Sequence, residues 1–119
     1  MKSGELDKLK IELRKFAKER DWDKFHSPKN LSMALAVEAS ELLEHFQWLT
    51  EKESQQLDRK VLRDIEQEIA DVQIYLIRLA DKVGINIEGA VSKKMRSNKS
   101  RYPARFVKGS AKKYSYYIK

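Results

Sequence analysis

Apolar residues recur at spacings of three and four along residues 3–20. They are Leu6, Leu9, Leu13 and Phe16, and Lys, Glu and Arg fill the positions between them. This spacing places the apolar side chains on one face of an α-helix. The pattern therefore predicts an amphipathic helix over residues 3–20.

The period is lost in residues 20–30, RDWDKFHSPKN. Pro28 disfavours a helical conformation at Ser27, so this stretch is predicted to be a loop rich in aromatic residues. Asn30 is predicted to cap a second helix from about Leu31 to Phe46, because its side chain can accept a bond from a free backbone amide. This helix is apolar around most of its circumference.

Two further helix starts carry recognisable caps. Thr50 and Glu53 fit a capping box and predict a short helical turn, and Asp58 is predicted to cap a longer helix that ends at Gly84. A strong apolar stripe runs along the longer helix: Leu62, Ile65, Ile69, Val72, Leu76 and Leu79.

Asn86 is predicted to cap a fourth helix whose apolar side is formed by Ala90, Val91 and Met95. Irregular structure is expected beyond Tyr102 and Pro103. No segment shows the alternation typical of a strand. The predicted fold class is all-α, a small antiparallel helical bundle.

The composition is that of one globular domain: 119 residues, 41% hydrophobic and 36% charged. The chain has no Cys, which excludes disulfides and thiolate metal sites. The N-terminal residues lack the apolar core of a signal peptide, and no apolar stretch reaches the roughly 20 residues that cross a bilayer. We therefore expect a cytoplasmic protein without a membrane span.

The net charge of +7 is concentrated at one end of the chain. Residues 93–119 hold ten Lys or Arg and no acidic residue, whereas the remainder holds 15 basic and 18 acidic residues. A domain over residues 1–104 and a basic tail over 105–119 are predicted. The tail fits a solvated extension as well as a phosphate-binding segment. The acidic body argues against a basic helical nucleic-acid-binding protein, which is kept as an alternative.

Two pairs of carboxylates interrupt apolar helices. Glu38 and Glu41 lie three residues apart on the second helix, and Glu68 and Asp71 repeat the spacing on the third. This spacing puts both members of a pair on one helix face, and antiparallel packing would bring all four together. Buried like charges require a cation among them.

The type of carboxylate site can be narrowed from the neighbouring residues. Either pair alone is typical of a solvated helix face, but two pairs on two apolar helices favour a metal site. A ferritin-like di-iron site would need Glu-x-x-His elements, which are absent, as is HExxH. Mg²⁺, with Mn²⁺ as a substitute, is therefore the expected cofactor, because both prefer oxygen ligands.

Several segments in this order resemble one family. They are RDWDKFHSPKNLSMAL, the two acidic pairs, FQW at 46–48, VQIYLIRLA after Asp71, and SKKMRSNKSRYPA from residue 92. Together they resemble the MazG-like all-α nucleoside triphosphate pyrophosphohydrolases, and within them the dCTP pyrophosphatases, over about residues 13–114. Val37, Ser40 and Gln67 depart from residues common in that family, which leaves the substrate preference and metal affinity open.

The resemblance implies that a nucleoside triphosphate, dCTP or a modified dCTP, is hydrolysed between its α and β phosphates, removing unwanted nucleotides. It implies that Glu38, Glu41, Glu68 and Asp71 bind the metal. One carboxylate, Glu41 or else Glu38, would accept the proton of the attacking water. The alternative within the family is a member that binds nucleotide without turnover.

The resemblance and the residue chemistry also indicate substrate-binding groups. Aromatic and polar groups around the acidic helices are candidates for the base, and a later cationic segment is a candidate for the sugar and phosphates. The first set is Trp22, His26, Asn30, Trp48 and Tyr75, and the second is Lys94, Asn98, Arg101 and Tyr102. On residue type alone, Trp22 and Trp48 fit a core or a subunit interface better than a base-binding position. Tyr75 fits a buried tyrosine equally well.

The second helix is too apolar for one small bundle to cover, so helices of another subunit are expected to pack on it. The resemblance implies a homo-oligomer, with a tetramer favoured over a dimer and with sites formed between subunits.

Overall fold

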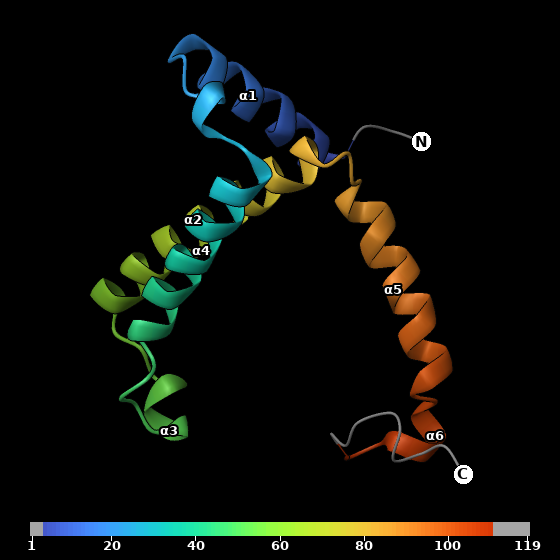
Figure 1. Cartoon of the computed structure of the whole chain (residues 1–119). Coiled ribbons are helices and arrows are strands. Elements are labelled where there is room, and N and C mark those ends of the chain that lie inside the picture. Colours follow the sequence, from blue (N-terminus) through green and yellow to red (C-terminus); the bar gives the residue numbers. More distant parts are fainter. Residues whose placement is uncertain (1–3, 111–119) are drawn as a thin grey trace. The chain divides into compact units, whose positions relative to one another are not determined.

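A computed structural model describes residues 4–110 (Figure 1). The chain divides into two compact units, Met1–Ile85 and Asn86–Lys119. Between residues 4 and 110 the structure contains helices and no strand, which confirms the all-α fold class. No helix in this range combines the length and apolar character that a membrane crossing requires.

The first unit is built on a pair of helices. Its elements are α1 (Glu5–Glu19), the 3-10 turn η1 (Asp23–Phe25), α2 (Pro28–Glu44), α3 (Glu51–Ser54) and α4 (Arg59–Lys82). Helices α2 and α4 run antiparallel and side by side, and α1 packs against α4 (Figure 1). This arrangement sets the two acidic pairs on facing helices.

Local hydrogen bonds explain most helix ends. Thr50 and Glu53 form the predicted capping box, and the Asp58 carboxylate accepts from the Val61 amide at 2.9 Å. Gly84 follows α4 with a φ of 74°, where a residue without a Cβ is unstrained. The predicted capping box, the cap at Asp58 and the helix end at Gly84 are therefore confirmed.

The predicted start of α2 was wrong. The helix begins at Pro28, and its cap is Ser27, whose hydroxyl accepts from the Asn30 amide at 3.1 Å. Proline suits the first helical position because that position needs no backbone donor. Asn30 therefore lies inside the helix instead of capping it.

The end of α1 fixes the position of Trp22. The Trp22 amide donates to the Ala17 carbonyl at 2.9 Å and the Asp21 amide to the Lys18 carbonyl at 3.1 Å, as in a Schellman motif. Asp21 has a φ of 55°, a conformation that aspartate tolerates better than most residues. The Trp22 ring then meets Phe16 edge to face, with 5.6 Å between ring centroids.

A strong ion pair ties α1 to α4. Arg14 donates from Nε and Nη2 to the two carboxylate oxygens of Asp81, at 2.6 and 2.5 Å. Two parallel bonds of this kind fix orientation as well as distance. Together with buried Ala17, this pair holds α1 on the C-terminal half of α4.

The apolar core of the described residues is small. Its buried members are Ala17, Leu31, Ile65, Ile77 and Ala80. Much of the apolar stripe of α4 instead stays open, since Leu62 is 53% exposed and Ile69 56%. On α2, Met33 and Val37 are 56% and 55% exposed. One copy of the chain therefore leaves large apolar surface uncovered on both long helices.

The second unit contains α5 (Ile87–Arg101) and the short α6 (Ala104–Val107). Asn86 caps α5 as predicted, accepting from the Gly89 amide at 2.7 Å. The expectation of irregular structure beyond Pro103 was wrong over Ala104–Val107, because Pro103 can itself open a helix and its carbonyl accepts from the Phe106 amide at 2.9 Å. Residues 111–119 of the predicted basic tail lie outside the described residues.

Candidate metal centre and adjoining pocket

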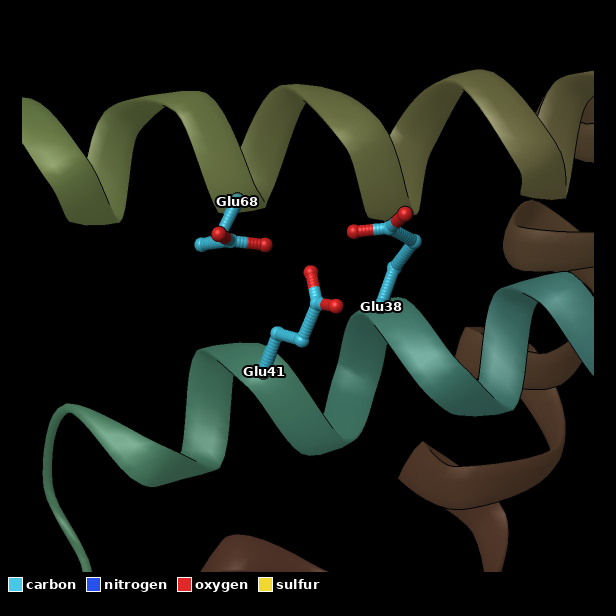
Figure 2. A group of neighbouring side chains, drawn as sticks. All are labelled: Glu38, Glu41 and Glu68. Carbon is cyan, nitrogen blue, oxygen red and sulfur yellow. The ribbon is translucent and has the colours of Figure 1, made fainter.

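Three carboxylates converge between α2 and α4. One oxygen from each of Glu38, Glu41 and Glu68 lies within 4.8 Å of the others. Figure 2 shows Glu38 and Glu41 rising from α2 toward Glu68, which descends from α4. The i, i+3 spacing on α2 and the antiparallel packing therefore bring together three of the four carboxylates that the sequence placed in one cluster.

Two of these carboxylates have an oxygen that is buried and has no partner among residues 4–110. They are Glu38 Oε2 and Glu68 Oε2, neither of which has a hydrogen-bond partner. Buried acceptors are normally satisfied, so an orphaned pair within one cluster indicates a missing donor or cation. Because all the ligand atoms are hard oxygens, the residues fit a divalent ion such as Mg²⁺ or Mn²⁺.

The cluster carries the electrostatic strain expected of grouped acids. Burial, reinforced by Glu41 and the other carboxylates, raises the pKa of Glu38 to about 7 from its ordinary value of 4.5. Burial is also the main cause that raises the pKa of Glu68, followed by the charge of Glu41. Asp71, the fourth predicted ligand, lies outside the three-residue group, but its charge raises the pKa of both glutamates.

The raised pKa of Glu38 predicts a pH-dependent stability. The folded protein binds this proton more tightly than the unfolded chain, so the stabilisation is complete below pH 4.5 and is lost as the pH rises to about 7. The melting temperature of EDTA-treated protein should therefore fall over this range, and Mg²⁺ should restore it most strongly at the alkaline end. Glu38→Gln should flatten the fall; an unchanged profile in that variant would contradict the assignment.

A pocket of about 420 Å³ adjoins the cluster. Asp71, Tyr75 and Arg78 line it from successive turns of α4, and Trp22 and His26 line it from the loop after α1. Its remaining wall is apolar, formed by Leu13, Phe16, Ala17 and Ile74. Asp71 lines the pocket, and its charge also raises the pKa of Glu38 and Glu68, so the pocket lies near the carboxylates.

Two predicted base-binding residues do not line this pocket. The Asn30 side-chain amide donates to the Phe25 carbonyl at 3.0 Å and so supports the loop. Trp48 lies beyond the end of α2 and is 86% exposed. Within one chain, therefore, only Trp22, His26 and Tyr75 of the predicted base-binding set come together.

The predicted phosphate-binding residues belong to the second unit. Lys94, Asn98 and Arg101 share α5, and Tyr102 follows it directly with its amide bonded to the Asn98 carbonyl at 2.8 Å. Spacings of three and four place Lys94, Asn98 and Arg101 along one side of that helix. Their role toward a nucleotide stays a prediction.

Sequence reasoning missed Arg78 and Asp23. Arg78 is 3% exposed although it carries a charge, and its guanidinium donates to the Asp23 carboxylate at 2.9 Å. The only sequence signal was an arginine inside the apolar run VQIYLIRLA, seven residues after Asp71 and so on the same helix face.

Comparison with known proteins gives a consistent result. The sequence model of the MazG-like family matches residues 33–116. Over 102 residues the chain is 43% identical to dCTP pyrophosphatase 1 of Rattus norvegicus and 42% identical to that of Homo sapiens. These matches cover 84% of this chain and 60% of each relative, so the chain spans about 60% of the length of these curated relatives.

A solved structure matches over nearly its whole length. A pyrophosphatase from Archaeoglobus fulgidus DSM 4304 has a TM-score of 0.73 and 39% sequence identity to this chain, covering 87% of this chain and 96% of that one. Fold, acidic pairs and sequence similarity therefore agree, and the chain belongs to the MazG-like family.

Proposed function

We propose that this protein hydrolyses a nucleoside triphosphate, dCTP or a modified dCTP, to the monophosphate and pyrophosphate. The observation that carries the proposal is the carboxylate cluster with two orphaned buried oxygens, set beside an aromatic pocket. Relatives named dCTP pyrophosphatase 1 and a solved pyrophosphatase support the substrate and the reaction class.

The acidic residues would hold the metal. Glu38 and Glu68 offer their unpartnered oxygens, Glu41 completes the group, and Asp71 lies toward the pocket. When bound, Mg²⁺ or Mn²⁺ offsets the charge of the phosphates and of the leaving pyrophosphate. The protein supplies the fixed geometry, because the ligands project from two packed helices.

Other residues are proposed to bind the base, to accept the proton of water and to bind the sugar and phosphates. Trp22 and Tyr75 offer aromatic surfaces to the base, and His26 a ring nitrogen. Glu41 is the proposed base, because the orphaned buried oxygens belong to the other two glutamates. It accepts the proton of a water whose oxygen bonds to the α phosphorus, while the bond from this phosphorus to the bridging oxygen breaks and that oxygen leaves with the pyrophosphate. Lys94, Asn98, Arg101 and Tyr102 are proposed to bind the sugar and phosphates.

A panel of the common nucleoside triphosphates tests this function. With Mg²⁺ present, monophosphate and pyrophosphate should form in equal amounts, and EDTA should stop the reaction until Mg²⁺ or Mn²⁺ is added back. Release of orthophosphate instead would contradict cleavage between the α and β phosphates. Tight binding with no product would favour the alternative of a nucleotide-binding protein without turnover.

We further propose that the chain forms a homo-oligomer, a tetramer, through α2 and α4. The support is the exposed apolar surface on both helices, since burying each large apolar side chain contributes about 1.5–3 kcal/mol. In such an assembly Trp48 of one copy can complete the pocket of another.

Lysine substitutions test the proposed interface. Met33→Lys combined with Leu62→Lys should shift the protein to smaller species in sedimentation velocity, because a charge would be buried at the contact. Gln55→Lys, at an exposed polar position, adds the same type of charge and should leave the assembly intact. An unchanged assembly in the double variant would exclude α2 and α4 as the interface.

A further inference from the structure

The buried guanidinium of Arg78 contacts a histidine as well as acids. Its side chain is 4% exposed, and Nη2 lies 2.9 Å from the Asp23 carboxylate. Nη2 also lies 3.1 Å from His26 Nδ1, and Nε lies 3.4 Å from the same atom. Arg78 Nη1 is 3.8 Å from Asp81. The two acids compensate the buried charge, so the position of the guanidinium is fixed independently of the histidine.

The chemistry of the pair decides which nitrogen of His26 carries hydrogen. A guanidinium has five N–H donors and no acceptor, so the atom facing it must supply a lone pair. Nδ1 of His26 can do so only when it is unprotonated. The proton of the neutral ring then lies on Nε2, because the other tautomer and the imidazolium would each set an N–H against Arg78.

Burial and the neighbouring cations favour the neutral form of the His26 ring. Burial lowers the pKa of His26 below its ordinary value, and the positive charge of Arg78 lowers it further. Lys82 acts in the same direction, whereas Asp23 opposes them. These groups belong to η1 and α4, the elements around His26, and Asp71 is the acid that lines the pocket beside His26.

His26 lines the pocket together with Trp22 and Tyr75. We propose that Arg78 is a positioning residue that holds His26 as a neutral Nε2–H donor, which selects a pyrimidine with a ring acceptor. The substrate part of this inference rests on the proposed function. Cytosine N3 is an acceptor, whereas N3 of uracil and thymine carries hydrogen. The fixed Nε2–H donor can therefore bond to cytosine N3, whereas with uracil or thymine it would face another N–H donor.

Nuclear magnetic resonance of the nucleotide-free protein tests the tautomer without any turnover. Long-range ¹H–¹⁵N correlation of the imidazole should show His26 in the Nε2–H form at pH 7. Arg78→Met keeps the length and the apolar packing of the side chain. In this variant His26 should show a mixture of tautomers and a higher pKa. Lys82→Met removes the other cation bonded to Asp23, at 2.6 Å, and should leave the Nε2–H form in place.

Selectivity is the second readout. Arg78→Met should lower the ratio of kcat/KM for dCTP over dUTP about five- to tenfold, the range expected when a base-specific hydrogen bond is lost. Arg78→Lys keeps the charge but loses the planar fork, so it should recover only part of the ratio.

The outcomes separate the inference from the proposed function. An Nδ1–H or doubly protonated His26 in the wild-type protein would overturn the inference even if triphosphates are hydrolysed. An unchanged ratio in a folded Arg78→Met variant would also overturn it. If no triphosphate is hydrolysed at all, the proposed function fails while the tautomer result stands by itself.

Discussion

Replacing Glu38 or Glu68 with glutamine is expected to lower kcat/KM for the preferred triphosphate by roughly 10²–10⁴-fold, because several kcal/mol of metal-dependent stabilisation are lost at about 1.4 kcal/mol per tenfold. The substitution keeps the size of the side chain and removes its charge. Steady-state assays at saturating Mg²⁺, with circular dichroism as the check on folding, measure the effect.

The same variants should keep or raise the thermal stability of the metal-free protein, although they lower its activity. Glu38 and Glu68 are crowded by like charges, and each has a buried oxygen that no group in the described part of the chain satisfies. In EDTA, Glu38→Gln should therefore melt at or above the wild-type temperature while its activity is lost. Glu66→Gln is the matched control, since Glu66 is an exposed glutamate on α4, the helix that carries Glu68. Near-wild-type turnover in either cluster variant would reject the carboxylate site.

The base preference is the second large effect. We expect dCTP to exceed dTTP and dUTP by at least about tenfold in kcat/KM, with purines poorer still, because a buried polar group left unpaired costs about 1–3 kcal/mol. His26→Ala should cause a matching loss for dCTP. Competition assays with paired triphosphates measure these ratios directly.

The two tryptophans separate a pocket within one chain from a pocket completed by another subunit. Trp22 lines the pocket, whereas Trp48 is 86% exposed in the single chain. Equal losses for Trp22→Ala and Trp48→Ala would support a pocket shared between subunits, and a loss for Trp22→Ala alone would support the single-chain pocket. Equal rates on all bases would refute the cytosine preference and leave the hydrolase proposal intact.

Local signals in the sequence predicted the elements well where one residue dominates the backbone chemistry. Asp58, Asn86 and Gly84 each occupy the predicted terminal position. The start of α2 was misplaced because Ser27 and Asn30 are both good caps, and only the proline between them decides.

The carboxylate cluster was predictable because its geometry follows from helix periodicity and antiparallel packing. The link between Arg78 and Asp23 was not, because these residues are 55 positions apart and no periodicity relates a loop to a helix. The wall of the pocket likewise depends on how the end of α1 turns at Asp21, which a residue pattern does not encode.

The small core has a consequence for sequence variation in this protein. If the outward faces of α2 and α4 are covered by other copies of the chain, residues such as Val37 and Ile69 will tolerate change no better than Leu31 does. A saturation-mutagenesis map should then show intolerance to polar residues at these exposed positions, and its pattern would trace the contact surface of the assembly directly.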